Sequence, residues 1–211
     1  MNTFFEPWIG SGYSQKNYKI LVIGDSHYCG GHERCGVKGN CSFEEMKDCN
    51  DFTQVTVKSY IDFRKNIGEK HGWMTKTFYP FDKIFYGKEN VTMEESLELW
   101  NSISFYNFLQ TAYIEEATNV FYSNTDYILS SPLCYNVIKE LRPNLIIVWG
   151  NRAYNHLPNT NWEDGTNYYN GKYLIDNEIK CIRIYHPSRA NVSYWHSVLT
   201  DFIGMEPNKL L

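Results

Sequence analysis

No stretch of the 211 residues is apolar over the length that a bilayer-spanning helix needs, and the first ten residues lack the basic segment and apolar run of an export signal. Positive charge is not in excess either, since 20 Lys and Arg stand against 24 Asp and Glu. This balance excludes a general attraction to nucleic acid or anionic membrane, so any nucleic-acid contact must be local. We expect a soluble, cytoplasmic monomer without a membrane partner.

The sequence also lacks internal repeats, low-complexity segments and any linker that would divide it. A chain of this length can bury a full hydrophobic core without disulfides or metals to support it. We therefore expect residues 1–211 to form one domain.

Six cysteines are present, but the paired C-x2-C arrangement of common zinc sites is not. In a reducing compartment these residues are thiols or metal ligands rather than a disulfide framework. Four of them fall within 21 residues and have the chemistry of a tetrahedral zinc site: Cys29, Cys35, Cys41 and Cys49. Two alternatives stay open, a structural zinc and thiols without metal, and no other cofactor is expected. Cys134 and Cys181 lie in apolar patterns and are predicted to be core residues.

Three segments have the composition of buried strands, being short, rich in Ile and Val, and bounded by turn residues. They are residues 18–24, 144–150 and 180–188. A hairpin around Asp176 and Asn177 would place an antiparallel partner beside the third strand. Residues 158–171 are polar and predict a surface loop.

Helical patterns occupy residues 51–68, 92–105, 131–143 and 190–204. Pro143 and Gly204 are the expected stops of the last two. This alternation predicts an α/β fold of three layers, α/β/α, around a central, mostly parallel sheet. Ligand sites in such sheets lie at the carboxyl ends of the strands. Each predicted strand ends in polar residues there: Gly24 to Tyr28, Gly150 with Asn151, and His186 with Ser188.

One interpretation of these residues is an SGNH-type esterase, which "GDS", "GN" and a late "HPS" resemble. That resemblance implies Ser26 as nucleophile, Gly150 with Asn151 at the oxyanion hole, and His186 as base. The family places a carboxylate three residues before the His, and this sequence has Arg183 there. A cation at that point opposes the imidazolium that forms during acyl transfer.

The sequence also resembles the uracil-DNA glycosylase superfamily, in which a first-strand motif of the type GQDPYH is paired with a late HPS motif. Here the two are "GDSHYC" (24–29) and "HPS" (186–188). "SISFYNFLQ" (102–110) and "LIIVWGNRAYNHL" (145–157) follow the family's order between them, and an aromatic-rich helical segment follows HPS. The resemblance implies a uracil-DNA glycosylase-like fold and a pocket for a base flipped from single- or double-stranded DNA.

The resemblance also implies roles for individual residues. Asn107 reads the edge of the base, and Tyr28 excludes a C5 methyl group. Phe52, or else Phe43, supplies a stacking face, and His186 donates a hydrogen bond to the departing base. Arg189 enters the DNA stack or contacts a phosphate. The predicted crevice comprises Gly24, Asp25, Ser26, His27, Tyr28, Phe52, Asn107, His186, Ser188 and Arg189.

The first motif departs from the family at its water-activating carboxylate. Ser26 stands where GQDPYH has Asp, and the nearest carboxylate is Asp25. A serine orients water but is no general base at neutral pH. Asp25 either serves as the base or caps the following turn. Two functions therefore follow from the resemblance: excision of uracil or another modified base from DNA, and non-catalytic binding of a base or nucleotide.

Overall fold

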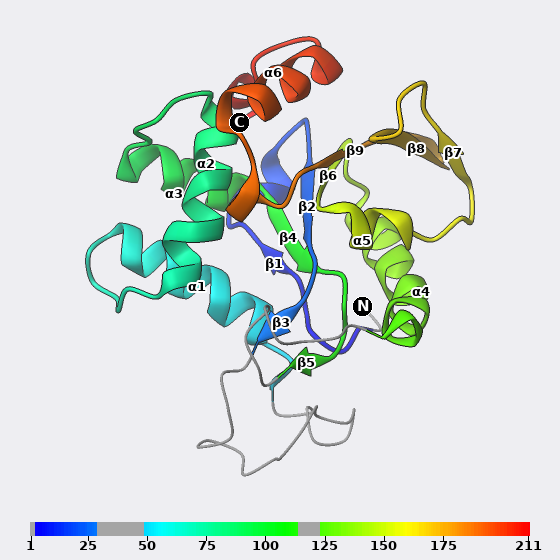
Figure 1. Cartoon of the computed structure of the whole chain (residues 1–211), viewed down its shortest axis with the longest axis horizontal. Helices are drawn as coiled ribbons and strands as arrows, with labels where there is room; N and C mark the ends of the chain where they lie inside the picture. The colour runs from blue at the N-terminus through cyan, green and yellow to red at the C-terminus, as the bar shows by residue number, and fades with distance from the viewer. Residues whose placement is uncertain (1–2, 29–48, 114–122) are drawn as a thin grey trace.

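The computed structural model describes residues 3–28, 49–113 and 123–211 and has a seven-stranded mixed sheet at its centre (Figure 1). The strand order is β1-β4-β2-β6-β9-β8-β7. The bounds are β1 Trp8–Ile9, β2 Ile20–Gly24, β4 Ser104–Asn107, β6 Leu145–Trp149, β7 Trp162–Asp164, β8 Asn170–Ile175 and β9 Asn177–Ile184. A separate pair joins β3 (His27–Tyr28) to β5 (Ala112–Tyr113).

The middle of the sheet is parallel and its edges are antiparallel. Strands β4, β2, β6 and β9 run in one direction, whereas β1, β8 and β7 pair antiparallel outside them. From β2 the chain first adds β4 on one side and then β6 and β9 on the other. The connections therefore reverse direction between β2 and β6, which is where open α/β sheets form a ligand crevice.

Helices cover both faces of the sheet because β2 and β6 are apolar on both faces. Ile20 and Val22 of β2 point into one core cluster, and Leu21 and Ile23 point into the other. On the first face lie α1 (Phe52–Arg64), α2 (Tyr79–Tyr86), α3 (Met93–Ser102) and α6 (Val192–Ile203). On the second lie α4 (Asn124–Leu141) and α5 (Asn151–Asn155). The chain is thus an α/β protein, as predicted.

A buried carboxylate joins three helices on the first face. Asp82 of α2 accepts hydrogen bonds from Tyr60 Oη of α1 at 2.6 Å, and from Ser96 Oγ and Trp100 Nε1 of α3 at 2.5 and 2.9 Å. Burial raises the pKa of Asp82 to about 6. These three donors satisfy a group that would otherwise be costly to bury, so Asp82 has a structural role in joining these helices.

Strands form in all three predicted segments and the hairpin is confirmed, although the third strand, expected over 180–188, ends at Ile184 and a short turn over Pro187–Arg189 follows. Asp176 occupies the turn between β8 and β9 with φ of +56°, a conformation that Asp tolerates better than most residues. Gly204 ends α6 with φ of +86°, as its position predicted.

Two predicted boundaries were wrong. The helix expected over 92–105 ends at Ser102, and the chain then forms β4, a central strand of the sheet. The helix expected from 131 begins at Asn124 and passes through Pro132. Helix α2 was not predicted, because Pro80 suggests a break but occupies the first turn, where proline is tolerated. The predicted loop over 158–171 contains β7. Among the described residues, no helix combines the length and apolarity needed to cross a membrane.

Candidate functional site

The carboxyl edge of the parallel strands brings several of the residues predicted at the strand ends to one side of the sheet. Gly24 ends β2 and Asn107 ends β4, and the two are paired in register. Gly150 follows β6, and His186 follows β9 two residues beyond its end. These strands are neighbours in the sheet, so residues far apart in the sequence meet at this edge as predicted.

Gly24 makes room for the Asn107 side chain. A β-carbon at position 24 would lie 2.2 Å from Asn107 Oδ1 and 2.9 Å from the Phe105 ring. The Asn107 side chain is 7% exposed, and its amide forms no hydrogen bond with any described residue. Asn107 therefore offers both an acceptor and donors to a ligand at the end of β4.

Asp25 is nine-tenths buried and is held from two sides. Its Oδ1 accepts a hydrogen bond from Tyr127 Oη at 2.7 Å, and its Oδ2 lies 3.1 Å from Arg152 Nη2. Burial raises the pKa of Asp25, and the Tyr127 hydrogen bond, Arg152 and His156 oppose that rise. The contacts with α4 and α5 show that Asp25 ties β2 to the second helical layer, a role that neither prediction for this residue included.

Ser26 and Tyr28 lie next to each other in the segment that follows β2. Ser26 Oγ donates to Tyr28 Oη at 2.8 Å. The Tyr28 ring is half-buried and lies 6.5 Å from the ring of Tyr113 on β5. Tyr28 is thus fixed through both its hydroxyl and its strand, as a residue that limits the size of a pocket needs to be.

His27 points away from this edge. Its ring lies between Phe5 and Phe52, with centroids 4.2 and 5.1 Å away, and its Nε2 is 2.8 Å from Thr53 Oγ1. Burial lowers its pKa to about 3. The described residues leave His27 no exposed face for a ligand, and the face of Phe52 that stacks on His27 is occupied. Phe43 lies outside the described residues.

His186 is neutral at physiological pH, and its tautomer follows from its contacts. Its Nδ1 accepts from the backbone N–H of Ser188 at 3.4 Å and lies 2.8 Å from Ser188 Oγ. A backbone N–H can only donate, so the ring proton is on Nε2. Burial lowers the pKa of His186 to about 4, helped by Arg152 and Arg189. His186 is therefore a neutral Nε2–H donor.

Arg189 and Ser188 belong to the short turn that follows His186. Both are exposed, whereas Pro187, which precedes Ser188, is buried. Arg189 is near enough to His186 to act on its charge. Arg189 is thus exposed at the carboxyl edge of the sheet, next to His186.

The contacts of His186 do not form an esterase triad. In the described residues its hydrogen bonds go to Ser188, and no carboxylate orients its imidazole. Arg183, at the position of the expected acid, donates to Asn151 Oδ1. An acyl-transfer base needs a carboxylate on its second nitrogen, so this geometry argues against the esterase.

The predicted zinc ligands fall largely outside the described residues. Cys29, Cys35 and Cys41 are among the residues not described, and Cys49 is exposed beside the start of α1. Within the described part of the chain, no group of three or more His, Cys, Asp or Glu could hold a metal. The zinc site stays a prediction. Cys134 and Cys181 are buried in the core, as expected.

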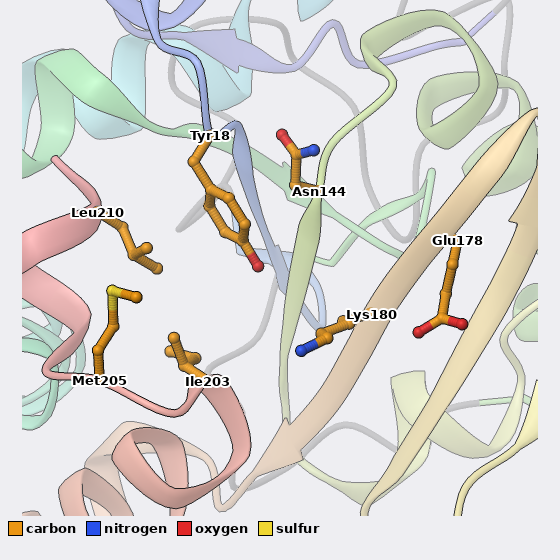
Figure 2. Close-up of a pocket in the computed structure, with 7 residues that line it drawn as sticks. All are labelled: Tyr18, Asn144, Glu178, Lys180, Ile203, Met205 and Leu210. Carbon is orange, nitrogen blue, oxygen red and sulfur yellow. The ribbon is translucent and has the colours of Figure 1, made fainter.

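A cavity of about 240 Å³ lies at the opposite, amino-terminal edge of the sheet (Figure 2). Tyr18, Asn144, Glu178 and Lys180 line one side, and Ile203, Met205 and Leu210 line the other. Asn144 Oδ1 is already bonded to the backbone N–H of Lys19, and Glu178 and Lys180 are exposed. These polar residues of the cavity are therefore bonded or exposed, unlike the buried polar groups at the carboxyl edge.

The sequence did not indicate Tyr127 or Arg152 as residues of the carboxyl edge. It indicated Arg183 only as a departure from the esterase pattern, and not as a buried side chain of this region. Arg152 and Asn151 follow the "WG" that ends β6, and that position was the available signal for Arg152. A scan against models of protein families and a search of curated proteins each find no match. The functional conclusion therefore depends on this geometry and on the motifs.

Proposed function

We propose that this protein recognises uracil or another modified base flipped from DNA, in a crevice at the carboxyl ends of β2, β4, β6 and β9, and that its fold is of the uracil-DNA glycosylase type. The observation that carries the proposal is Asn107. Asn107 is largely buried, its amide makes no hydrogen bond within the described residues, and it lies where Gly24 leaves space. An amide can pair with the acceptor and donor on the edge of a pyrimidine.

His186 supplies the second polar contact of the proposed pocket. Cleavage of an N-glycosidic bond leaves negative charge on the base, and a fixed donor near a base oxygen stabilises that charge. A neutral imidazole with its proton on Nε2 has this property, and the contacts of His186 support that state. The backbones of β4 and β9 are three strand spacings apart, or about 14 Å. That separation suits a planar base between side chains from the two strands.

A second candidate function, non-catalytic binding of a base or nucleotide, is favoured by the contacts of Asp25. Hydrolysis needs a carboxylate that positions and polarises water. Both oxygens of Asp25 are engaged, by Tyr127 and by Arg152, and Ser26 donates to Tyr28. The groups that would read the base do not depend on these contacts, so recognition without excision is chemically consistent.

The test uses single- and double-stranded oligonucleotides that carry a panel of modified bases. Binding is followed by fluorescence anisotropy, and excision by alkaline cleavage at abasic sites. We expect tighter binding to a uracil- or modified-base strand than to the unmodified strand, and Asn107→Ala should weaken that preference about tenfold or more, as loss of a buried polar contact does. Asn136→Ala, on the exposed face of α4, is the matched control.

Two outcomes separate the candidates. Excision by the wild-type protein supports a glycosylase, and preference without excision supports a binding protein. If no modified base is bound or removed, and Asn107→Ala behaves as Asn136→Ala does, the crevice is not a base site.

A further inference from the structure

Arg183 is a buried cation with no carboxylate partner among the described residues. It lies on β9 and is 4% exposed, on the face of the sheet where Cys181 packs toward α4 and α5. Its Nη1 donates to Asn151 Oδ1 at the start of α5. Its Nε and Nη2 are buried and have no hydrogen-bond partner among the described residues. A buried charge with unmade hydrogen bonds is costly, and proteins normally pair it.

The two groups without partners form one edge of the guanidinium. Nε–H and Nη2–H point in parallel, and this edge is the one that receives two oxygens of a phosphate or carboxylate together. Arg152 provides a contrast on the neighbouring helix, because Asp25 already balances its charge. The structure thus keeps one arginine paired and a second one with its bidentate edge unused.

Tyr168 covers the guanidinium from the solvent side. Its ring centroid lies 4.7 Å from Arg183 Cζ, although the side chain itself is 76% exposed. Tyr168 belongs to the connection between β7 and β8, and the next residue anchors that connection, since the backbone N–H of Arg183 donates to Tyr169 O at 2.6 Å. A largely exposed ring over a buried cation can turn away at small cost, because a cation–π contact at an exposed site is weak.

We propose that Arg183 is the centre of a phosphate-binding site, reached when the Tyr168 ring turns away from the guanidinium. Nε–H and Nη2–H donate to two phosphate oxygens, and Asn151 holds the guanidinium in place through Nη1. Arg189 is close enough to His186 to lower the pKa of its imidazole, so the same edge of the sheet carries a further positive charge. This favours a phosphate over a singly charged carboxylate. The site deepens the proposed function by naming a second group of the ligand.

The test is calorimetric titration of the intact protein with inorganic phosphate, at constant ionic strength set by chloride. Arg183→Gln should weaken phosphate binding tenfold or more. Tyr168→Ala should tighten it about threefold or more by removing the competing ring, and Tyr168→Phe should leave it unchanged. Arg142→Gln is the matched control, since it removes an exposed arginine whose partner is Asp176 at the other edge of the sheet.

Thermal unfolding provides a second readout that does not require tight binding. Phosphate should raise the Tm of the wild-type protein and of Arg142→Gln, but not that of Arg183→Gln. Should Arg183→Gln fail to fold, the comparison of Tyr168→Ala with wild type still decides. Equal phosphate affinity in wild type and folded Arg183→Gln overturns the proposal, and so does absence of phosphate binding by both wild type and Tyr168→Ala.

The source of the phosphate is resolved by two further ligands. If Arg183→Gln weakens binding of deoxyuridine monophosphate but not of deoxyuridine, the site takes a terminal phosphate. If it weakens binding of an unmodified single-stranded oligonucleotide, the site takes a phosphodiester. Inorganic phosphate carries no base, so it can bind Arg183 even if the protein does not recognise a base. Conversely, a protein that does not bind phosphate can still recognise a base, which the oligonucleotide assay measures separately.

Discussion

Asp25 and Arg152 form an ion pair of 3.1 Å between the segment after β2 and helix α5, and the aspartate is far more buried than the arginine. Removing Arg152 leaves a buried carboxylate that still accepts the hydrogen bond from Tyr127. We expect Arg152→Met to lower the free energy of unfolding by about 1–2 kcal/mol at pH 7, less than a fully buried pair because Arg152 is half exposed.

The effect of Arg152→Met should depend on pH in a definite direction. Burial raises the pKa of Asp25, so the folded protein keeps this proton to higher pH than the unfolded chain. The stabilisation that comes from this bound proton is complete below the ordinary carboxyl pKa. It is lost as the pH rises through the pKa of Asp25 in the folded protein. Without Arg152 the pKa of Asp25 rises further, so the loss of stability caused by Arg152→Met should be smaller at pH 4 than at pH 7. Urea unfolding at both pH values measures it. Arg142→Met, at an exposed ion pair, should cost less than about 0.5 kcal/mol.

A side chain at Gly24 should displace Asn107. The added β-carbon in Gly24→Ala would approach Asn107 Oδ1 to 2.2 Å, so one of the two must move. We expect a loss of stability of about 1–3 kcal/mol, as in other overpacked cores, and a loss of base preference tenfold or greater. Chemical unfolding and oligonucleotide anisotropy measure the two effects. Gly72→Ala is the control, because nothing lies within 4 Å of its β-carbon. A stable Gly24→Ala protein with unchanged base preference would contradict this role of Asn107.

The strands that carry the candidate site could be predicted from the sequence where burial on both faces determines their composition. Residues 20–24 and 145–149 are apolar without alternation, and a run of that length between turn residues is typical of a strand covered on both faces. Polar residues directly after these runs indicated the edge at which ligands bind. The hairpin followed from Asp176 and Asn177, whose local chemistry permits the turn.

Other features depended on contacts that the sequence does not display. Residues 104–107 continue the apolar spacing of the preceding helix, and only pairing with β2 makes them a strand. Tyr127 is 102 residues from Asp25, and no local pattern links a tyrosine on α4 to that carboxylate. The same holds for Arg183, whose position in the sequence suggested a missing acid rather than a buried cation.

His186 should titrate well below an ordinary histidine. Burial, Arg152 and Arg189 lower its pKa to about 4, so the imidazole is neutral from pH 5 upward. NMR titration of the His186 ring should give that midpoint, and Arg189→Gln should raise it by removing one positive charge. Arg142→Gln should leave it unchanged. Base recognition that needs the Nε2–H donor should be flat between pH 6 and 8. A midpoint above pH 6 in the wild-type protein would be inconsistent with this electrostatic environment.

The cysteine cluster gives a prediction about metal content. If Cys29, Cys35, Cys41 and Cys49 hold a metal, it is zinc, because four thiolates suit its tetrahedral geometry. Elemental analysis of protein purified without added metal or chelator should then give about one zinc per chain. Removal by a strong chelator should lower Tm, since a site that closes a loop contributes to folding. Cys134→Ser, in the buried core, should leave the zinc content unchanged. A zinc content far below one per chain would support thiols without metal.

Ser26 is the position at which the first motif lacks a carboxylate. Its hydroxyl lies 2.8 Å from the Tyr28 hydroxyl, on the segment that leaves β2 toward the crevice. An aspartate there would supply a group to polarise water and to stabilise positive charge on the sugar. We predict that Ser26→Asp creates or raises excision of uracil from single-stranded DNA by on the order of a hundredfold, as a positioned general base does. Alkaline cleavage of an end-labelled uracil oligonucleotide measures the rate.

The variant pairs separate the possible reasons for a gain or its absence. Adding His186→Ala should remove the gain, because the leaving-group donor is lost, and Ser26→Asn should give none, because it adds volume and hydrogen bonding without a base. If the wild-type protein already excises uracil and Ser26→Asp slows it, Asp25 performs the water activation despite Tyr127 and Arg152. If Ser26→Asp folds and binds the uracil strand but does not cleave it, the crevice lacks the geometry for attack on the sugar, and the binding function is the correct one.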